Sequence, residues 1–254
     1  ENIMDKIISA KNLVKSFDNG GIKQTIIKDL DIDIYENDFT VIMGSSGAGK
    51  STLMYCLSGM DLPTDGTVIF NGKDITKMSS DELAVFRRSN CGFVFQQVYM
   101  LDKMSLLDNV LTAGLLINKN KKEILKNAKE LFEKVNLSEH TIRKNVNKVS
   151  GGEAQRAGIV RAAINSPICL FADEPTGALN SETGNAVLDV FTTLNNDGQS
   201  IIMVTHDKKS ALRGNRIIYL KDGKIFGELK LDKYNGDSKE RNDKLNMFLE
   251  DMGW

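Results

Sequence analysis

The sequence has few cysteines, and this scarcity excludes two classes of protein. The three that are present, Cys56, Cys91 and Cys169, include no CxxC pair. A disulfide framework or a cysteine-ligated zinc site needs more thiols at closer spacing. Cys56 and Cys169 lie within apolar runs, which is typical of small core residues in a reducing compartment.

Long apolar runs and an excess of charge are also missing. No stretch approaches the roughly 20 apolar residues needed to cross a bilayer, and the first residues lack a signal-peptide pattern. We therefore expect no direct membrane insertion, so that any membrane role acts through a partner chain. The 33 Lys and Arg against 34 Asp and Glu give a net charge of −1. This balance offers no electrostatic argument for binding nucleic acid or an anionic membrane surface.

The length allows one large domain or two small ones with a full core; the strand and helix signals predict an α/β protein, interpreted as a single domain over residues 1–254. Hydrophobic residues make up 41 % of the 254 residues and charged residues 26 %, as in ordinary globular proteins. The apolar runs Phe39–Met43, Ile168–Ala172 and Ser200–Val204 have the composition of buried parallel strands. A helix at Asn185–Leu194 separates the last two runs, which gives a strand–helix–strand unit.

Other segments predict antiparallel strands and an inserted helical region. Strands are expected at Ile7–Phe17 and Gln24–Tyr35, and two-residue hairpin turns at Asn71-Gly72 and Asp222-Gly223. Helical signals dominate residues 79–137, and we expect a helical subdomain at about 80–165. A short amphipathic helix is expected at about 238–252.

Residues 44–52 carry the strongest chemical signal. They match G-x-x-x-x-G-K-[ST], with an apolar strand before them and a helix at Ser51–Ser58. Glycines let the backbone N–H groups wrap around a phosphate, and the helix N-terminus adds partial positive charge. The motif predicts ATP bound with Mg²⁺, with the Lys50 ammonium on the β/γ-phosphates and the Ser51 hydroxyl on the metal. The expected nucleotide contacts are Gly44, Ser45, Ser46, Gly47, Ala48, Gly49, Lys50, Ser51 and Thr52.

An acidic pair, Asp173 and Glu174, ends the buried-type strand at 168–172. Ligands of parallel sheets bind at the carboxyl ends of strands, so these side chains are expected beside the phosphate loop. Asp173 can hold Mg²⁺ through water, and Glu174 can act as the general base for an attacking water. The alternative is a solvated acidic turn before Pro175.

A second helix start follows Val149. Ser150 and Glu153 have the spacing of a capping box, so the simplest interpretation is a well-capped helix. The glycines between them, Gly151 and Gly152, also leave backbone N–H groups open to an anion.

In this order the motifs closely resemble those of the ATP-binding-cassette (ABC) ATPases. Val149–Glu153 reads VSGGE and is similar to the family signature LSGGQ. Gly92–Gln96 looks like the Q-loop, Asp173–Thr176 like the end of Walker B, and Thr205–Asp207 like the switch-histidine segment. The resemblance covers about residues 7–230. It implies the ABC ATPase fold, an α/β P-loop NTPase core with an antiparallel β subdomain and an inserted α-helical subdomain.

The resemblance also implies partners and residue roles. It implies a head-to-tail homodimer in the presence of ATP, each nucleotide being held by the phosphate loop of one copy and the signature of the other. Glu174, His206, Gln96 and Lys50 would then be catalytic, with Gln96 also sensing Mg²⁺. Phe17 matches the position that stacks on adenine, which suits an aromatic face; the alternative is an ordinary strand-end aromatic. The signature contacts would be Ser150, Gly151, Gly152 and Glu153.

Two positions depart from the family pattern. Glu153 replaces the usual Gln, with little effect expected. Asn180 stands where the D-loop, Gly177–Asn180, usually has Asp, which removes a charge at the dimer seam and puts the coupling of the two sites in doubt.

His140 lies in a polar stretch and is interpreted as a surface residue.

Further stretches, Phe86-Arg87-Arg88 and Asp108-Asn109-Val110, resemble one subfamily. It contains macrolide exporters, lipoprotein-releasing ATPases and antimicrobial-peptide resistance transporters. In these systems the ATPase drives a separate membrane permease, which would hold this chain on the cytoplasmic face of the membrane. The apolar segment Val98–Leu101 would line the groove for the permease's coupling helix; the alternative is ordinary core.

Four other functions are alternatives for a chain with a phosphate loop. The main alternative is a non-transport ATPase of the cell-division type, which shares the subfamily. The single cassette and near-neutral charge count against a soluble ABC protein of DNA repair or translation. A P-loop kinase does not need the signature, and a nucleotide-binding scaffold that does not hydrolyse ATP would leave Glu174 without a role.

Overall fold

The computed structural model describes residues 5–254 and divides into two compact units. Among the described residues, the first unit comprises residues 5–84 with Gln199–Trp254, and the second comprises Val85–Gly198. The first four residues of the expected domain lie outside the described residues.

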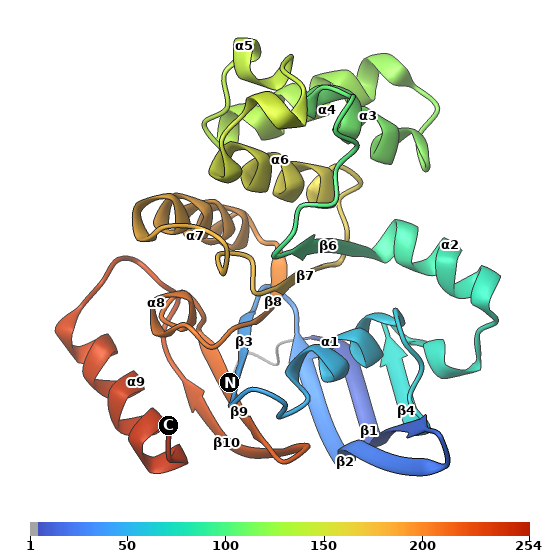
Figure 1. Cartoon of the computed structure of the whole chain (residues 1–254), viewed down its shortest axis with the longest axis vertical. Helices are drawn as coiled ribbons and strands as arrows, with labels where there is room; N and C mark the ends of the chain where they lie inside the picture. The colour runs from blue at the N-terminus through green and yellow to red at the C-terminus, as the bar shows by residue number, and fades with distance from the viewer. Residues whose placement is uncertain (1–4) are drawn as a thin grey trace. The chain divides into compact units, whose positions relative to one another are not determined.

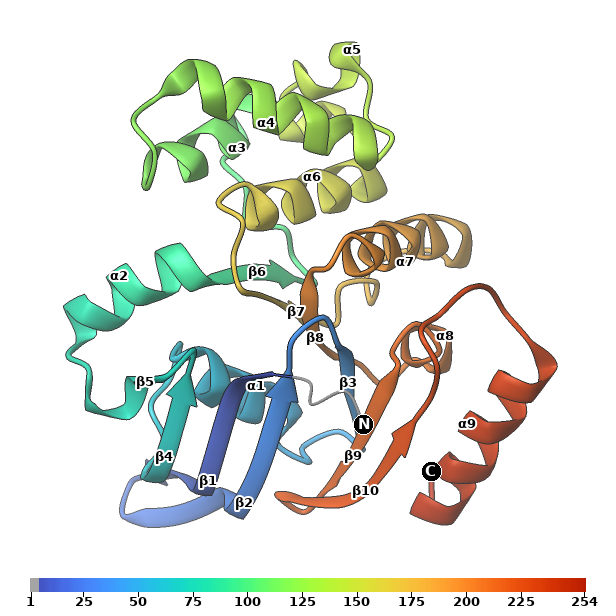
Figure 2. The same cartoon turned by 180° about the vertical axis from the view of Figure 1, so that it is seen from behind.

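The first unit contains an antiparallel sheet with the strand order β2-β1-β4-β5, and Figures 1 and 2 show β2, β1 and β4 side by side. This confirms the antiparallel strands that the alternating sequence pattern predicts. The first strand is longer than expected by one residue at its start and two at its end, and the second begins two residues earlier than expected. The elements are β1 (Lys6–Asn19), β2 (Ile22–Tyr35), β4 (Asp65–Phe70) and β5 (Lys73–Asp74).

Both predicted hairpin turns are confirmed by their backbone angles. Asn71 and Gly72 have φ of 47° and 75°, and Asp222 and Gly223 have φ of 51° and 78°. A type I′ turn needs positive φ at both central residues, and Asn-Gly and Asp-Gly tolerate this best. The first turn joins β4 to β5, and the second joins β9 (Arg216–Lys221) to β10 (Lys224–Lys230).

A second group of strands in this unit runs in the order β10-β9-β3-β8, with β3 (Phe39–Met43) parallel to both β8 (Ser200–Val204) and β9. Every residue of β3 and β8 is buried, which explains their continuous apolar runs. Helix α9 contacts β10 (Figure 1). The helices of this unit are α1 (Lys50–Ser58), a short turn at Ile75–Lys77, α8 (Lys208–Ala211) and α9 (Lys239–Met252).

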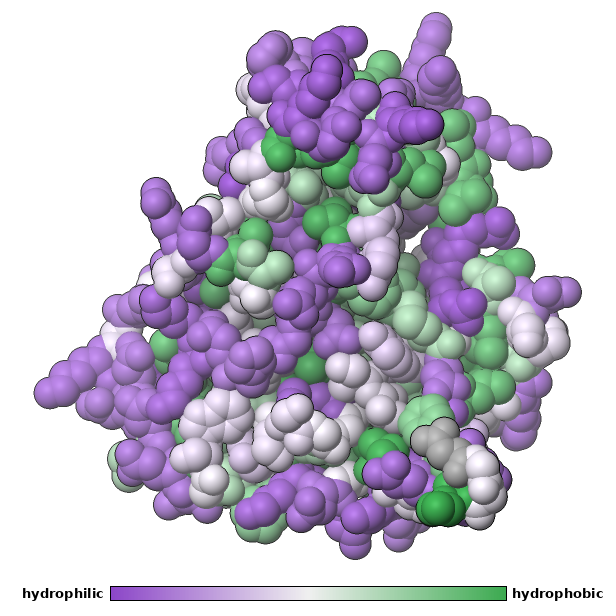
Figure 3. Space-filling view, viewed as in Figure 1, coloured by the Kyte–Doolittle hydropathy of each residue, from purple (hydrophilic) through white to green (hydrophobic). Residues whose placement is uncertain are grey.

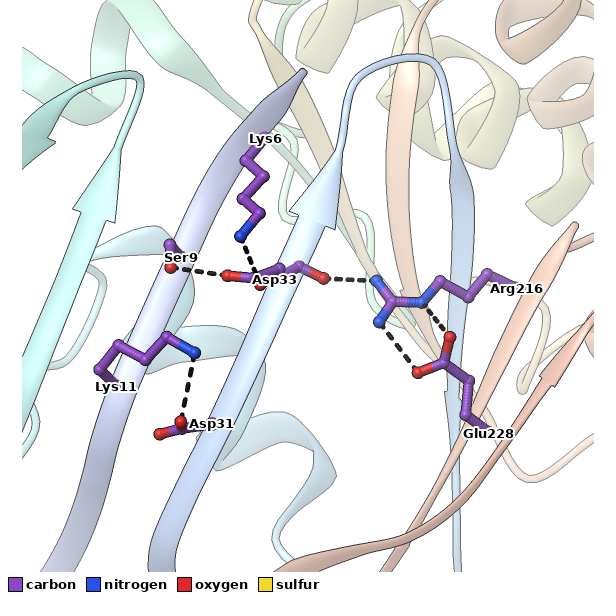
Figure 4. Close-up of polar contacts among 7 residues, drawn as sticks. All are labelled: Lys6, Ser9, Lys11, Asp31, Asp33, Arg216 and Glu228. Carbon is purple, nitrogen blue, oxygen red and sulfur yellow. Dashed lines mark hydrogen bonds and ion pairs between the residues drawn. The ribbon is translucent and has the colours of Figure 1, made fainter. Parts of the chain in front are cut away.

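Arg216 on β9 links the two sheets of the first unit (Figure 4). Its guanidinium forms a two-point ion pair with Glu228 at 3.0 and 3.1 Å and donates a hydrogen bond to the backbone carbonyl of Asp33 on β2. The Asp33 carboxylate accepts hydrogen bonds from the Ser9 hydroxyl at 2.6 Å and the Lys6 ammonium at 2.9 Å. Arg216 is buried, and such a fork of donors holds its partners in one geometry.

The second unit combines one parallel strand pair, β6 (Cys91–Phe95) and β7 (Cys169–Asp173), with a set of helices. Helix α2 (Ser80–Asn90) leads from the first unit into it. Side-chain caps explain where several helices begin: Ser105, Asn120, Ser150 and Asn180 each accept a hydrogen bond from a backbone N–H of the first turn. The helices are α3 (Leu106–Leu115), α4 (Lys121–Lys134), α5 (Glu139–Ile142), a turn at Val146–Lys148, α6 (Gly151–Ala163) and α7 (Ser181–Asn196).

Strand β6 lies inside a segment in which the sequence indicated mainly helices. Its five residues are too few to show the two-residue period of a strand, and the helical patterns of the neighbouring segments dominate this part of the sequence. Gly92 allows α6 to cross the strand closely, because a Cβ there would lie 2.3 Å from the Ala162 carbonyl oxygen. The rings of Phe93 and Phe171 stack at 5.5 Å across the strand pair.

Apolar residues recur at helical spacing in 124–135, and several of them are core residues. Ile124, Ala128 and Phe132 on α4 are buried, as is Val135 just beyond it. This amphipathic face holds α4 against α3 and α6.

Candidate functional site

The phosphate loop joins the end of β3 to the start of α1, as its motif predicts. Gly44 has φ of 149°, and a Cβ there would lie 2.2 Å from the Leu220 carbonyl oxygen. No other residue fits that approach. Gly49, with φ of 98°, is the N-cap of α1 and makes no side-chain cap hydrogen bond. The loop therefore offers backbone groups and a helix N-terminus, which is the cradle that a phosphate chain requires.

Lys50 is buried at the first position of α1. Its ammonium donates hydrogen bonds to the carbonyl oxygens of Gly44 at 2.8 Å and Ser45 at 2.9 Å. The charge thus lies within the loop, and these carbonyls hold it in place. An entering phosphate can replace them as a stronger, charged acceptor.

His206 lies at the strand end next to the phosphate loop. Strands β3 and β8 run parallel with Ile42 opposite Val204, and the Thr205 N–H donates to the Ile42 carbonyl at 3.2 Å. His206 follows directly and is exposed. The sheet register thus brings the expected switch histidine to the edge from which Gly44 leaves.

Phe17 is on β1 in the same unit and is 41 % exposed. The Lys15 ammonium lies 4.9 Å from the centre of its ring. Exposure of the ring suits stacking on a base, so adenine binding by Phe17 stays a prediction.

Gln96, Asp173 and Glu174 lie together in the second unit. Phe95 pairs with Asp173 in the parallel register of β6 and β7, so Gln96 and Glu174 leave the sheet at the same edge. A Cβ on Gly177 would lie 3.1 Å from Gln96 Nε2, which places the glutamine amide against the turn that follows Glu174. The structure therefore brings these three expected catalytic and metal residues to one edge.

Glu174 has a strained backbone. Its φ of 46° lies in the left-handed region, which non-glycine residues seldom adopt. Such conformations cost about 1–3 kcal/mol and cluster at functional sites. The Gly177 N–H donates to the Glu174 carbonyl at 3.0 Å and closes the turn that holds this conformation.

The predicted capping box at the start of α6 is confirmed. The Ser150 hydroxyl accepts from the Glu153 N–H at 3.2 Å, and the Glu153 carboxylate accepts from the Ser150 N–H at 2.7 Å. That backbone hydrogen bond lowers the pKa of Glu153. A Gln could make the same contact, which fits the small effect expected of this replacement.

The signature glycines also serve packing, which the sequence did not indicate. A Cβ on Gly152 would lie 2.0 Å from Thr183 Cγ2, and one on Gly151 would lie 3.5 Å from Leu179 Cδ2. Thr183 is in the first turn of α7, and its N–H donates to the Asn180 side chain at 2.9 Å. The signature and the D-loop are therefore packed against each other, and Asn180 is a helix cap.

Three residues of the second unit have structural roles that the sequence did not indicate. The Gln155 amide donates to the Phe95 carbonyl at 2.9 Å, and the Arg161 guanidinium donates to the Val98 and Tyr99 carbonyls at 2.7 and 2.6 Å. Asn109 accepts from the Leu101 N–H at 2.8 Å. Gln155 and Asn109 are almost fully buried. A polar residue at a helical position that is expected to be buried is the signal that could have indicated them, because buried polar groups need hydrogen-bond partners.

These contacts hold the segment after Gln96, in which two large side chains are exposed. Tyr99 is 68 % exposed and Leu101 is 59 % exposed. The alternative interpretation of Val98–Leu101 as ordinary core therefore fails for these two residues.

Ser51, Gln96 and Asp173 are the expected metal residues. They offer hydroxyl, amide and carboxylate oxygens, the hard donors that Mg²⁺ prefers. Within residues 5–254, no cluster of three or more His, Cys, Asp and Glu forms a cage for a metal ion. The donor set suits Mg²⁺ that arrives with phosphate, because this ion takes few protein ligands and keeps several waters.

A family model described as ABC transporter matches residues 27–177. An uncharacterized ABC transporter ATP-binding protein of Methanocaldococcus jannaschii is 41 % identical over 86 % of this chain and 97 % of its own length. A lipoprotein-releasing system ATP-binding protein of Aquifex aeolicus is 39 % identical over 89 % of this chain and 99 % of its own length.

A macrolide export ATP-binding/permease protein of Campylobacter jejuni is 37 % identical over 89 % of this chain, which spans only 35 % of that protein. Among solved structures, a dimeric ATP-binding cassette in a post-hydrolysis state with ADP and phosphate matches with a TM-score of 0.81 and 36 % identity. That match covers 89 % of this chain and 100 % of the cassette. No helix within residues 5–254 is long and apolar enough to cross a membrane.

Proposed function

The chain belongs to the ABC transporter family and has the fold of its ATPase cassettes, and from this premise we propose that it binds and hydrolyses ATP to drive a separate membrane permease. The permease would hold it on the cytoplasmic face of the membrane. Export of, or resistance to, antimicrobial peptides, macrolides or lipoproteins is the proposed task. Two of the relatives named above are lipoprotein-release and macrolide-export proteins, which favours transport over cell-division signalling.

The phosphate loop is the observation that carries this proposal. Gly44 admits a close backbone approach, Gly49 leaves the start of α1 open, and Lys50 places a buried cation in the same loop. This combination binds the β- and γ-phosphates of a triphosphate through backbone N–H groups and the Lys50 ammonium, which exchanges its carbonyl partners for phosphate oxygens.

Each remaining residue has a proposed role at the γ-phosphate. Glu174 accepts the proton of an attacking water or orients that water, and His206 donates a hydrogen bond to the phosphate. Ser51, Gln96 and Asp173 hold Mg²⁺, which supplies positive charge that offsets the charge of the phosphates. Ser150, Gly151, Gly152 and Glu153 bind the nucleotide of a second copy in an ATP-dependent homodimer; a similar cassette is dimeric in its solved structure.

Replacing Glu174 by Gln tests this function. The amide cannot take a proton, so we expect hydrolysis of MgATP to fall by a factor of about 10² or more. The bound ATP should then hold two copies together, and light scattering should report twice the monomer mass only in the presence of MgATP.

Glu182→Gln is the matched control, because Glu182 is an exposed glutamate in the first turn of α7. It should hydrolyse MgATP like the wild type and show no lasting dimer. A Glu174→Gln protein that stays monomeric in saturating MgATP would refute the shared nucleotide site, and undiminished hydrolysis would refute the role of Glu174.

A further inference from the structure

We propose that the α3–α4 corner, residues 115–122, docks on the anionic phospholipid headgroups of a membrane. The corner comprises the end of α3, the connection after it and the first turn of α4. The inference rests on the proposed function only in placing the chain at a membrane.

The first half of the corner is an exposed apolar triplet. Leu115, Leu116 and Ile117 are 43 %, 59 % and 43 % exposed. Three consecutive aliphatic residues with so much exposed surface lower solubility, so they indicate a contact surface. Figure 3 shows hydrophobic residues gathered at this end of α3 and α4, with hydrophilic side chains projecting beside them.

The second half is basic. Lys119, Lys121 and Lys122 are exposed, and none has an ion-pair partner in the part of the chain that the structure describes. Glu123 is the nearest acidic residue, and its carboxylate accepts a hydrogen bond from the Asn118 amide at 3.0 Å. The corner therefore carries a local excess of positive charge that the overall charge of −1 conceals.

The position of two of these lysines opposes helix stability. Lys121 and Lys122 occupy the first turn of α4, where the helix dipole disfavours cations. Residues that cost stability and pair with nothing in the described chain are explained by an external anionic partner.

The backbone of the corner is held by close packing and hydrogen bonds. A Cβ on Gly114 would lie 2.4 Å from Ile124 Cγ2, which shows how closely α3 and α4 approach. The Asn165 amide donates to the Ala113 carbonyl at 3.1 Å, and Asn120 caps α4. Little conformational entropy is lost on docking, which favours binding.

Adjacent aliphatic and lysine side chains match the chemistry of a membrane interface. Aliphatic side chains enter the headgroup region while lysines meet lipid phosphates. An acidic protein surface could satisfy the lysines, but three exposed aliphatic residues next to them need an apolar layer as well. Anionic lipid supplies both, which decides in its favour.

Vesicle sedimentation tests the proposal. Wild-type protein should bind vesicles of phosphatidylcholine with about 30 % phosphatidylglycerol more strongly than pure phosphatidylcholine vesicles, and about 0.5 M salt should release it. The triple variant Lys119→Gln, Lys121→Gln, Lys122→Gln should bind anionic vesicles at least about tenfold more weakly, because each lysine near the surface contributes about fivefold. Leu116→Ser should also weaken binding.

Matched controls separate the corner from overall charge and hydrophobicity. Lys224→Gln, Lys233→Gln, Lys239→Gln removes the same charge from exposed positions of the first unit, and Val85→Ser removes an exposed aliphatic side chain from α2. Both should bind anionic vesicles like the wild type, and all variants should retain MgATP hydrolysis, which reports the proposed function separately.

Three outcomes would overturn the proposal. They are equal binding to both kinds of vesicle, equal loss in the corner and control variants, and no binding of the wild type to protein-free vesicles. If the wild type binds no protein-free vesicle and the corner variant loses its hold on a co-expressed permease, the corner contacts protein.

Discussion

At the scale of single residues, Gly152 combines a packing role with its place in the signature. Its missing side chain lets α6 touch Thr183 on α7, so Gly152 is constrained by shape as well as by the anion expected at this helix start. Glu174 is also constrained by local geometry, because its backbone keeps a left-handed conformation that costs conformational free energy.

Gly152→Ala should destabilise the protein by about 1–3 kcal/mol in urea denaturation, because the new methyl overlaps Thr183 Cγ2. Adding Thr183→Ser removes that methyl group of the threonine and should recover at least half of the loss. Gly151→Ala is the control, since its Cβ would meet Leu179 Cδ2 at an ordinary 3.5 Å. Equal losses for the two alanine variants would contradict the packing role.

At the scale of elements, α6 connects the signature to the exposed segment after Gln96. Its N-cap is Ser150, its second turn holds Phe95 through Gln155, and its last turn holds Val98 and Tyr99 through Arg161. Val98 packs closely on Gly158, where a Cβ would lie 2.9 Å from Val98 Cγ1. A displacement of α6 therefore moves the carbonyls of this segment.

Arg161→Gln should loosen residues 97–101, because two backbone carbonyls lose a charged donor worth about 1.5–3 kcal/mol each. Hydrogen–deuterium exchange of this segment should rise at least about tenfold if half of that energy is lost. Arg143→Gln, which breaks only an exposed ion pair with Glu139, should leave it unchanged. Unaltered exchange in Arg161→Gln would show that Gln155 and Asn109 suffice.

At the scale of the whole molecule, charge is balanced overall but arranged locally. The net charge of −1 coexists with the basic α3–α4 corner and with carboxylates that depend on hydrogen bonds. Asp33 is one of these carboxylates, and it belongs to the network that joins the two sheets of the first unit. Burial opposes its ionisation, but the Ser9 and Lys6 contacts prevail and lower its pKa from the ordinary 3.8.

Stability should therefore fall in acid, and Asp33 should account for part of the fall. A carboxyl whose pKa is lower in the folded state stabilises the fold above its unfolded pKa, and the contribution disappears as pH falls through the folded pKa. Asp33→Asn should lower the urea midpoint at about pH 7, and its difference from wild type should shrink towards about pH 3.

Glu133→Gln on the exposed side of α4 is the control and should show no such trend. A difference between Asp33→Asn and wild type that stays constant with pH would contradict the role of the carboxylate.

The sequence alone determined the elements that depend on local chemistry. Asn71-Gly72 and Asp222-Gly223 required positive φ, Ser150 and Glu153 formed the capping box, and the phosphate loop followed its strand. These features follow from residues within a few positions of one another, so the printed order of residues contains the needed information.

Only the tertiary structure decided features that join distant residues. It showed that Gly152 meets Thr183, that Arg161 holds Val98, that β6 pairs with β7, and that Leu115–Ile117 stay exposed while Ile124 is buried. In each case the partner is far away in the sequence, or burial depends on what packs above the residue. Periodicity can mark an apolar face, but three-dimensional packing decides which face is covered.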